Sequence, residues 1–286
     1  MAGVVLGAVA AWMPGRSWGW AVLSLGPHRS LGALLAQKPR RVPRWLPVLG
    51  ALYSSGEDCT ETSAAARGSS VASYAERVRE LLRISAFLRF DYSGVGSSDG
   101  NLEECTVGKW RKDVLSIIDD LAVGPQILVG SSLGGWLMLH AAIARPGKVM
   151  ALIGVATAAD ALVTKFNQLP IEVKKEVELK GVWTLPSKYH EEGAYHIQYS
   201  FIKEAEQHCL LHSPIPVTCP IRLLHGMKDD IVPWHTSMQV ADRLVSTDVD
   251  VILRKHSDHR MKEKADIQLL VYTIDDLIDK LSTTVN

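Results

Sequence analysis

The chain of 286 residues suits one large α/β domain, and 47% of its residues are hydrophobic, which is enough for a sizeable core. Basic and acidic residues both number 31, so the formal net charge is zero and no nucleic-acid partner is indicated. The four cysteines form no CxxC pair and have no histidine at metal-ligand spacing. We therefore expect reduced thiols, with neither a disulfide framework nor a bound metal.

The first fifty residues differ in charge from the rest of the chain. Acidic residues begin only at Glu57, whereas six basic residues come earlier: Arg16, Arg29, Lys38, Arg40, Arg41 and Arg44. Such a segment is typical of an organelle transit peptide, and we predict a mitochondrial one over residues 1–50. A secretory signal fits less well, because the basic residues continue past the place where cleavage would occur. No apolar run reaches the roughly 20 residues of a membrane-spanning helix, so we expect no transmembrane segment.

Residues 51–87 form an atypical linker followed by a helix in this interpretation. The stretch 54–73 is small and polar without periodic apolar positions, which is typical of a flexible linker. The stretch 74–87, "YAERVRELLRISAF", has apolar residues at helical spacing.

From residue 88 to the C-terminus, strand-like and helix-like segments alternate. Strands are predicted at 87–92, 126–130, 149–158, 221–226 and 248–256, and helices at 106–122, 135–146, 236–246 and 264–282. Continuous apolar strands alternating with helices indicate a mostly parallel, doubly wound sheet. Residues 159–215 interrupt this rhythm with a helical, Lys/Glu-rich and aromatic segment. We interpret that segment as a cap over a substrate pocket.

The sequence "ILVGSSLGGWLML" places the pattern G-x-S-x-G between a strand and a helix. That context is the one required by a nucleophile elbow, in which a serine occupies strained backbone and glycines prevent collisions. The alignment makes Ser132 the nucleophile and Ser131 its neighbour. A packing turn without catalytic function is the alternative explanation of this motif alone.

An elbow serine needs an acid and a base, which follow it in that order along the chain. In "LLHGMKDDIVP", Asp229 and Asp230 come directly after a predicted strand, and we choose Asp229 because HGxxDxxVP is the usual form of this turn in α/β hydrolases. In "RKHSDHRM", His256 still belongs to the strand end, whereas His259 lies farther into the loop. We therefore assign His259 as the base.

This set of residues predicts acyl transfer to water. His259 would take the proton of Ser132 as the serine attacks an acyl carbon, and Asp229 would orient the imidazole. The backbone N–H of Leu133, which follows the nucleophile, would donate to the oxyanion.

Four stretches, "RFDYSGVGSSDG", "VGSSLGGWLML", "LLHGMKDDIVPWH" and "RKHSDHRM", closely resemble the mitochondrial palmitoyl-protein thioesterases of the α/β-hydrolase-domain group. The resemblance runs from about residue 88 to the C-terminus, and the start of the chain resembles the transit peptide of that group. It implies an α/β-hydrolase fold at 88–286 and a triad of Ser132, Asp229 and His259. It also implies hydrolysis of S-palmitoylated proteins and of small acyl-glucuronide or ester substrates, with no cofactor.

The chain departs from this pattern at residues 48–87. Members of the group have there an early pair of strands and a loop that donates the second oxyanion N–H. We therefore expect the early strands to be missing or altered. The alternative function is a catalytically impaired hydrolase-fold protein whose oxyanion hole is incomplete.

Overall fold

The computed structural model describes residues 9–10, 22–23, 88, 90–96, 98–122, 124–187 and 193–284. The predicted linker and helix lie outside these residues, as does the predicted transit peptide apart from residues 9–10 and 22–23. The domain limits at residues 50 and 87 therefore stay predictions.

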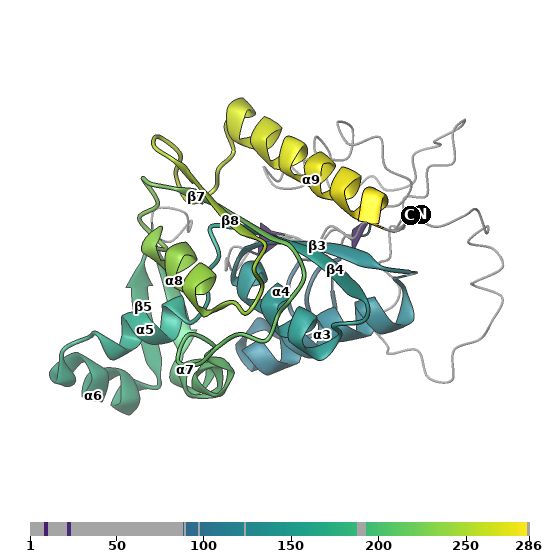
Figure 1. Cartoon of the computed structure of the whole chain (residues 1–286). Helices are drawn as coiled ribbons and strands as arrows, with labels where there is room; N and C mark the ends of the chain where they lie inside the picture. Colours follow the sequence, from purple (N-terminus) through teal and green to yellow (C-terminus); the bar gives the residue numbers. More distant parts are fainter. Residues whose placement is uncertain are drawn as a thin grey trace, which may run out of the picture.

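One mostly parallel sheet forms the centre of the molecule (Figure 1). Its order is β1-β3-β4-β7-β8, from strands β1 (Val9–Ala10), β3 (Gln126–Ser132), β4 (Val149–Val155), β7 (Ile221–Gly226) and β8 (Val249–Arg254). The pairs β3/β4, β4/β7 and β7/β8 are parallel, and the short strand β2 (Val22–Leu23) pairs antiparallel with β3. The predicted α/β-hydrolase architecture is confirmed.

Helices cover both faces of this sheet. Helix α9 (Lys264–Thr284) lies on one face, and α3 (Val107–Asp120), α4 (Leu133–Ala144) and α8 (His235–Arg243) lie on the other (Figure 1). Successive residues of β3 serve the two faces: Ile127 packs in the core cluster of α9, and Leu128 packs in the cluster of α3 and α4. Because α4 is enclosed almost all round, its apolar sequence has no polar stripe.

The ends of two predicted elements differ from expectation. Strand β4 stops at Val155 because Ala156 has a positive φ of 49° and turns the chain. A strand is predicted at residues 87–92, but among the described residues of this stretch, 88 and 90–92, only Leu88 and Asp91 make single bridges, and the chain turns at Ser93. The carbonyl of Asp91 accepts a hydrogen bond from the Ser98 hydroxyl at 2.7 Å. Past the short 3₁₀ turn η2 (Leu102–Glu104), the predicted amphipathic helix α3 begins at its Thr106 cap.

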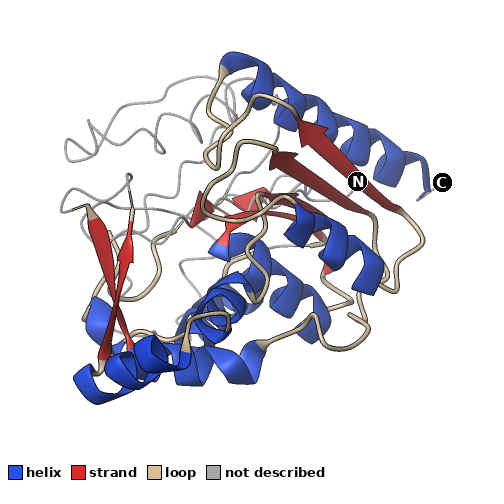
Figure 2. Cartoon of the chain, turned by 90° about the vertical axis from the view of Figure 1, so that its left-hand side faces the viewer, coloured by secondary structure: helices blue, strands red, loops and turns tan. Residues whose placement is uncertain are grey.

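The cap is inserted between β4 and β7. It contains α5 (Ala161–Asn167), α6 (Ile171–Lys180), β5 (Val182–Pro186), β6 (Ala194–Gln198), α7 (Tyr199–Ala205) and the turn η3 (Glu206–His208). The sequence predicted only helices here, but β5 and β6 form an antiparallel pair that stands apart from the main sheet (Figure 2). This pair buries the side chains of Trp183, Tyr195 and Ile197. Aromatic and β-branched residues of this kind are enriched in strands.

Asp160 ties the two ends of the cap together. This residue has a positive φ of 56° at the start of α5, and its side chain is buried. Its carboxylate accepts hydrogen bonds from the backbone N–H groups of Leu210 at 2.9 Å and Leu211 at 2.7 Å. The point where the cap leaves the core is thus joined to the point where it returns.

Candidate active site

Ser132 lies at the sharp turn between β3 and α4. Its backbone has φ 53° and ψ −124°, a conformation that L-residues rarely adopt. Gly130 permits the turn, since a Cβ atom on it would lie only 2.4 Å from the carbonyl oxygen of Gly134. The local sequence therefore folds as the elbow that G-x-S-x-G predicts.

His259 stands on the loop between β8 and α9 and reaches over the serine. Its Nε2 lies 3.0 Å from Ser132 Oγ, and its side chain is buried. The loop is fixed to α9 because the hydroxyl of Ser257 donates to the buried carboxylate of Asp266 at 2.6 Å. His256, the other histidine of this segment, is exposed.

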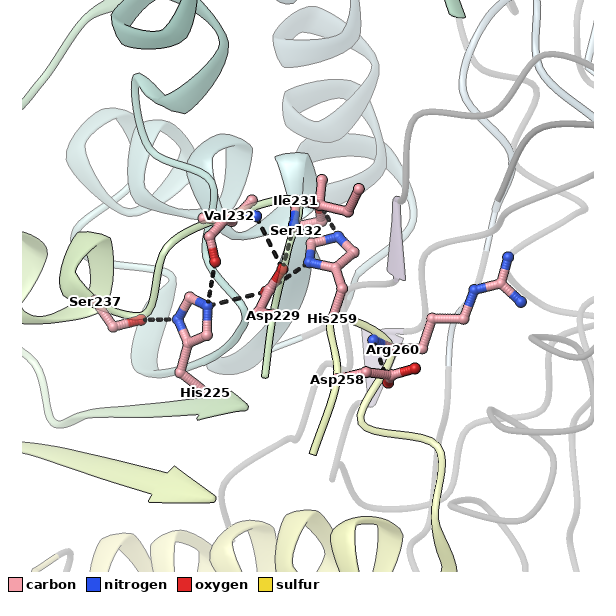
Figure 3. A network of polar contacts seen from close by, with 9 residues as sticks. All are labelled: Ser132, His225, Asp229, Ile231, Val232, Ser237, Asp258, His259 and Arg260. Carbon is pink, nitrogen blue, oxygen red and sulfur yellow. Dashed lines mark hydrogen bonds and ion pairs between the residues drawn. The ribbon is translucent and has the colours of Figure 1, made fainter. Parts of the chain in front are cut away.

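Asp229 completes a continuous row with these two side chains (Figure 3). Its Oδ2 lies 2.7 Å from His259 Nδ1, and its side chain is fully buried. Its Oδ1 accepts hydrogen bonds from the backbone N–H groups of Ile231 and Val232, both at 2.9 Å. Asp230, the neighbouring candidate, is exposed.

The surroundings of Asp229 keep it ionised. Burial is the largest single influence and by itself would raise the pKa of this carboxyl group. Hydrogen bonds from His225 and His259, the charge of His259 and the Val232 N–H group together outweigh burial and lower the pKa well below its usual value. The acid of the row is therefore an anion over the whole neutral range.

His225 belongs to this network but was not identified from the sequence. It is the penultimate residue of β7, four positions before Asp229, and its Nε2 lies 3.0 Å from Asp229 Oδ2. A histidine at the end of a buried, mostly apolar strand was the available signal. The sequence alone could not indicate which way its ring turns.

The loops that carry Asp229 and His259 contact each other through their backbones. The N–H of Lys228 donates to the carbonyl of Ser257 at 3.0 Å. A Cβ atom on Gly226 would lie 2.3 Å from that same carbonyl oxygen and 2.6 Å from the one of Asp258. These backbone contacts between residues 226–228 and residues 257–258 thus fix the separation between Asp229 and His259.

Leu133 is the first residue of α4, so its N–H is among those that have no acceptor within the helix. It follows the serine directly and lies where the elbow motif predicts an oxyanion donor. The segment 48–87, where we expect a second donor to be altered, lies outside the described residues.

A pocket of about 110 Å³ opens beside Ser132 and His259. The cap supplies much of its apolar wall, and the core adds more; the apolar lining includes Leu133, Trp136, Leu162, Leu185, Tyr195, Ile197, Phe201, Ile231 and Val232. Two cationic residues, Lys165 and Arg260, also line it, and none of the described lining residues is an aspartate or glutamate. Lys165 could not be predicted from the sequence, because its place depends on how the cap folds.

Comparisons with known proteins agree with this architecture. The model of the prolyl oligopeptidase family matches residues 125–281. The chain is 70% identical to palmitoyl-protein thioesterase ABHD10, mitochondrial, of Homo sapiens, with all of both chains covered, and 62% identical to the Mus musculus protein of that name, with 97% and 100% covered. The human alignment spans 306 positions, more than the 286 residues of this chain, so it contains gaps.

Solved structures give the same result. Alpha/beta hydrolase domain-containing protein 10 from mouse superposes with a TM-score of 0.70 at 72% identity, over 75% of this chain and 85% of that chain. The structure of Est1E from Butyrivibrio proteoclasticus with bound ferulic acid superposes with a TM-score of 0.57 at 17% identity, over 75% of this chain and 83% of that chain, which bears on the fold alone.

The sheet, the elbow and the covering helices define an enzyme of the α/β-hydrolase class. More narrowly, the chain belongs to the family of the mitochondrial palmitoyl-protein thioesterases named above. The mitochondrial location predicted from the first fifty residues is confirmed by these relatives. Among the described helices, none is both long and apolar enough to cross a membrane.

Proposed function

We propose that the protein is a serine hydrolase that depalmitoylates S-palmitoyl cysteines of proteins and also cleaves acyl glucuronides. The single observation that carries the proposal is the hydrogen-bonded row of Ser132, His259 and Asp229 on the wall of an apolar pocket. A serine, an imidazole and a buried carboxylate in this order form the arrangement that activates a hydroxyl for acyl transfer.

The reaction begins when Ser132 Oγ attacks the carbonyl carbon of the thioester or ester. His259 Nε2 accepts the hydroxyl proton, and Asp229 stabilises the resulting imidazolium. The Leu133 N–H donates to the oxyanion, aided by the positive end of the α4 dipole. Collapse breaks the C–S or C–O bond, and the imidazolium protonates the leaving group.

A water molecule then attacks the acyl-Ser132 carbonyl carbon. His259 takes a proton from this water and returns it to Ser132 Oγ as the acid is released. No group beyond the chain's own residues and water is needed for this sequence.

The pocket supports the choice of substrates. Apolar side chains from the cap and core provide a surface for a hydrocarbon chain, whose burial is favourable in proportion to its area. The names of the relatives specify a palmitoyl-protein thioesterase activity for those proteins. Lys165 and Arg260 favour a substrate that also carries a negative charge, as the carboxylate of an acyl glucuronide does.

A fluorophosphonate probe tests the serine mechanism. Wild-type protein should become labelled, Ser132→Ala should not, and the neighbouring Ser131→Ala should keep labelling, because Ser131 makes no part of the row. Hydrolysis of an S-palmitoyl cysteine peptide should follow the same pattern. Well-folded wild-type protein that is neither labelled nor active would refute the proposal and favour the impaired hydrolase with an incomplete oxyanion hole.

The acyl-glucuronide activity has its own test. Lys165→Met should raise KM for an acyl glucuronide while leaving KM for the neutral methyl ester of the same acid unchanged. Equal KM changes for the two substrates would show that Lys165 does not recognise charge, and wild-type protein inert toward acyl glucuronides would remove that substrate class.

A further inference from the structure

A second histidine approaches Asp229 from the side opposite to His259 (Figure 3). His225 Nε2 lies 3.0 Å from Asp229 Oδ2 and also 3.0 Å from the carbonyl oxygen of Val232. Its Nδ1 lies 2.7 Å from Ser237 Oγ on α8. The side chains of His225 and Asp229 are both fully buried, so bulk water competes with none of these contacts.

The acceptors around His225 define where its proton resides. A carbonyl oxygen only accepts hydrogen bonds, so the contact with Val232 requires the proton on Nε2. The carboxylate of Asp229, held ionised, is a second acceptor for the same N–H group. Nδ1 then accepts the hydroxyl hydrogen of Ser237, which satisfies both ring nitrogens without adding a charge.

The carboxylate of Asp229 is therefore surrounded by four donors. The Ile231 and Val232 N–H groups donate to Oδ1, and His259 and His225 both donate to Oδ2. Without His225, Oδ2 would keep only His259 as a hydrogen-bond donor among the described residues, so this oxygen would be held on one side instead of two. The orientation of His259 toward Ser132 depends on this oxygen.

We propose that His225 is a positioning residue of the reaction, which fixes the Asp229 carboxylate through its Nε2–H group and shares Oδ2 with His259. This inference rests on the serine-hydrolase function proposed above. His225 does not line the pocket, so it acts on the chemical step through Asp229 rather than on substrate binding. Ser237 supports it by fixing the ring tautomer.

The test compares His225→Phe with His225→Gln. The phenylalanine removes the donor and keeps a flat ring, and kcat should fall about 10- to 100-fold, as expected for one lost hydrogen bond to a charged group, with KM unchanged. Glutamine can present an N–H group near the position of Nε2, so His225→Gln should restore most of kcat.

A control and a spectroscopic measurement separate positioning from simple loss of stability. Arg222→Met removes another buried polar side chain from β7, one that pairs with Asp248 and Asp250 and touches no member of the triad. The low-field proton resonance of His259 Nδ1–H should shift in His225→Phe, because Oδ2 is no longer shared. It should keep its wild-type position in Arg222→Met.

Active wild-type protein together with a His225→Phe variant of full kcat and an unshifted resonance would overturn the inference. It would also fail if His225→Gln were as impaired as His225→Phe, or if kcat per folded molecule fell equally in Arg222→Met. Wild-type protein that does not react with the fluorophosphonate would instead refute the proposed function, so the two failures are distinguishable.

Discussion

Adding a methyl group at Gly226 should disable the site without touching any of its reacting groups. A Cβ atom at this position would lie 2.3 Å from the Ser257 carbonyl oxygen, whereas ordinary contact begins at 3.4 Å. Relieving this overlap moves the loop of His259 by about 1 Å, and a displacement of that size typically costs about 100-fold in rate. We therefore expect Gly226→Ala to lose about 100-fold in kcat/KM, equivalent to about 2.7 kcal/mol of transition-state stabilisation.

The assay is steady-state hydrolysis of a p-nitrophenyl ester, with the folded fraction measured by near-UV circular dichroism. Gly147→Ala is the matched control, since a Cβ atom there would meet nothing within 4 Å. The reasoning is refuted if Gly226→Ala keeps wild-type kcat/KM while it remains folded, because the loop would then have absorbed the methyl group without moving His259.

Three further predictions follow from Asp229 and Asp160. Asp229→Asn should lower kcat about 10³- to 10⁴-fold, because an amide cannot stabilise the His259 imidazolium; single-turnover kinetics measure this, and a near-normal kcat would contradict the assigned role. Because the folded-state pKa of Asp229 is lowered, its stabilising contribution is complete above the unfolded pKa of about 4 and is lost as pH falls below it. Denaturant unfolding should therefore show a shallower acid-side loss in Asp229→Asn than in wild type; parallel curves would argue against the lowered pKa. Asp160→Ala should lower the free energy of unfolding by about 1–3 kcal/mol, because two part-buried N–H groups lose their acceptor, and should raise KM for long acyl esters more than for acetate esters. An unchanged ratio of the two KM values would show that Asp160 does not hold the cap in place.

The central sheet was predictable from the sequence because its information is local. Strands β3, β4, β7 and β8 are rich in apolar residues, and each was predicted within a few residues of its observed ends. The β5–β6 pair was not predicted, because each strand has only five residues and the Lys/Glu-rich sequence of the neighbouring α6 favours a helix. Its stability comes from packing of Trp183 and Tyr195 within the cap, which no local pattern reports.

The residues of the site also fall into two groups, those predictable from local sequence and those that depend on tertiary contacts. Ser132, Asp229 and His259 lie in motifs whose spacing is short enough to be recognised, and the structure brings them within hydrogen-bonding distance. The roles of His225 and Lys165 depend on tertiary contacts: the first on a ring orientation fixed by α8, the second on the fold of the cap. The catalytic assignment itself is a proposal, which the labelling and kinetic experiments described above test.

The carboxylate of Asp160 holds the first and last residues of the cap next to each other. Because this one side chain joins residue 160 to residues 210 and 211, everything between them leaves and re-enters the core at nearly the same point. The hydrogen bonds that fix Asp229 and His259 come from β7, the acid loop and the serine elbow. The end of the segment 161–209 also contacts the core helices, since Trp136 and His140 of α4 lie within hydrogen-bonding distance of the His208 carbonyl oxygen. A chimaera in which the cap of another relative changes the acyl group accepted therefore has to keep these contacts with α4.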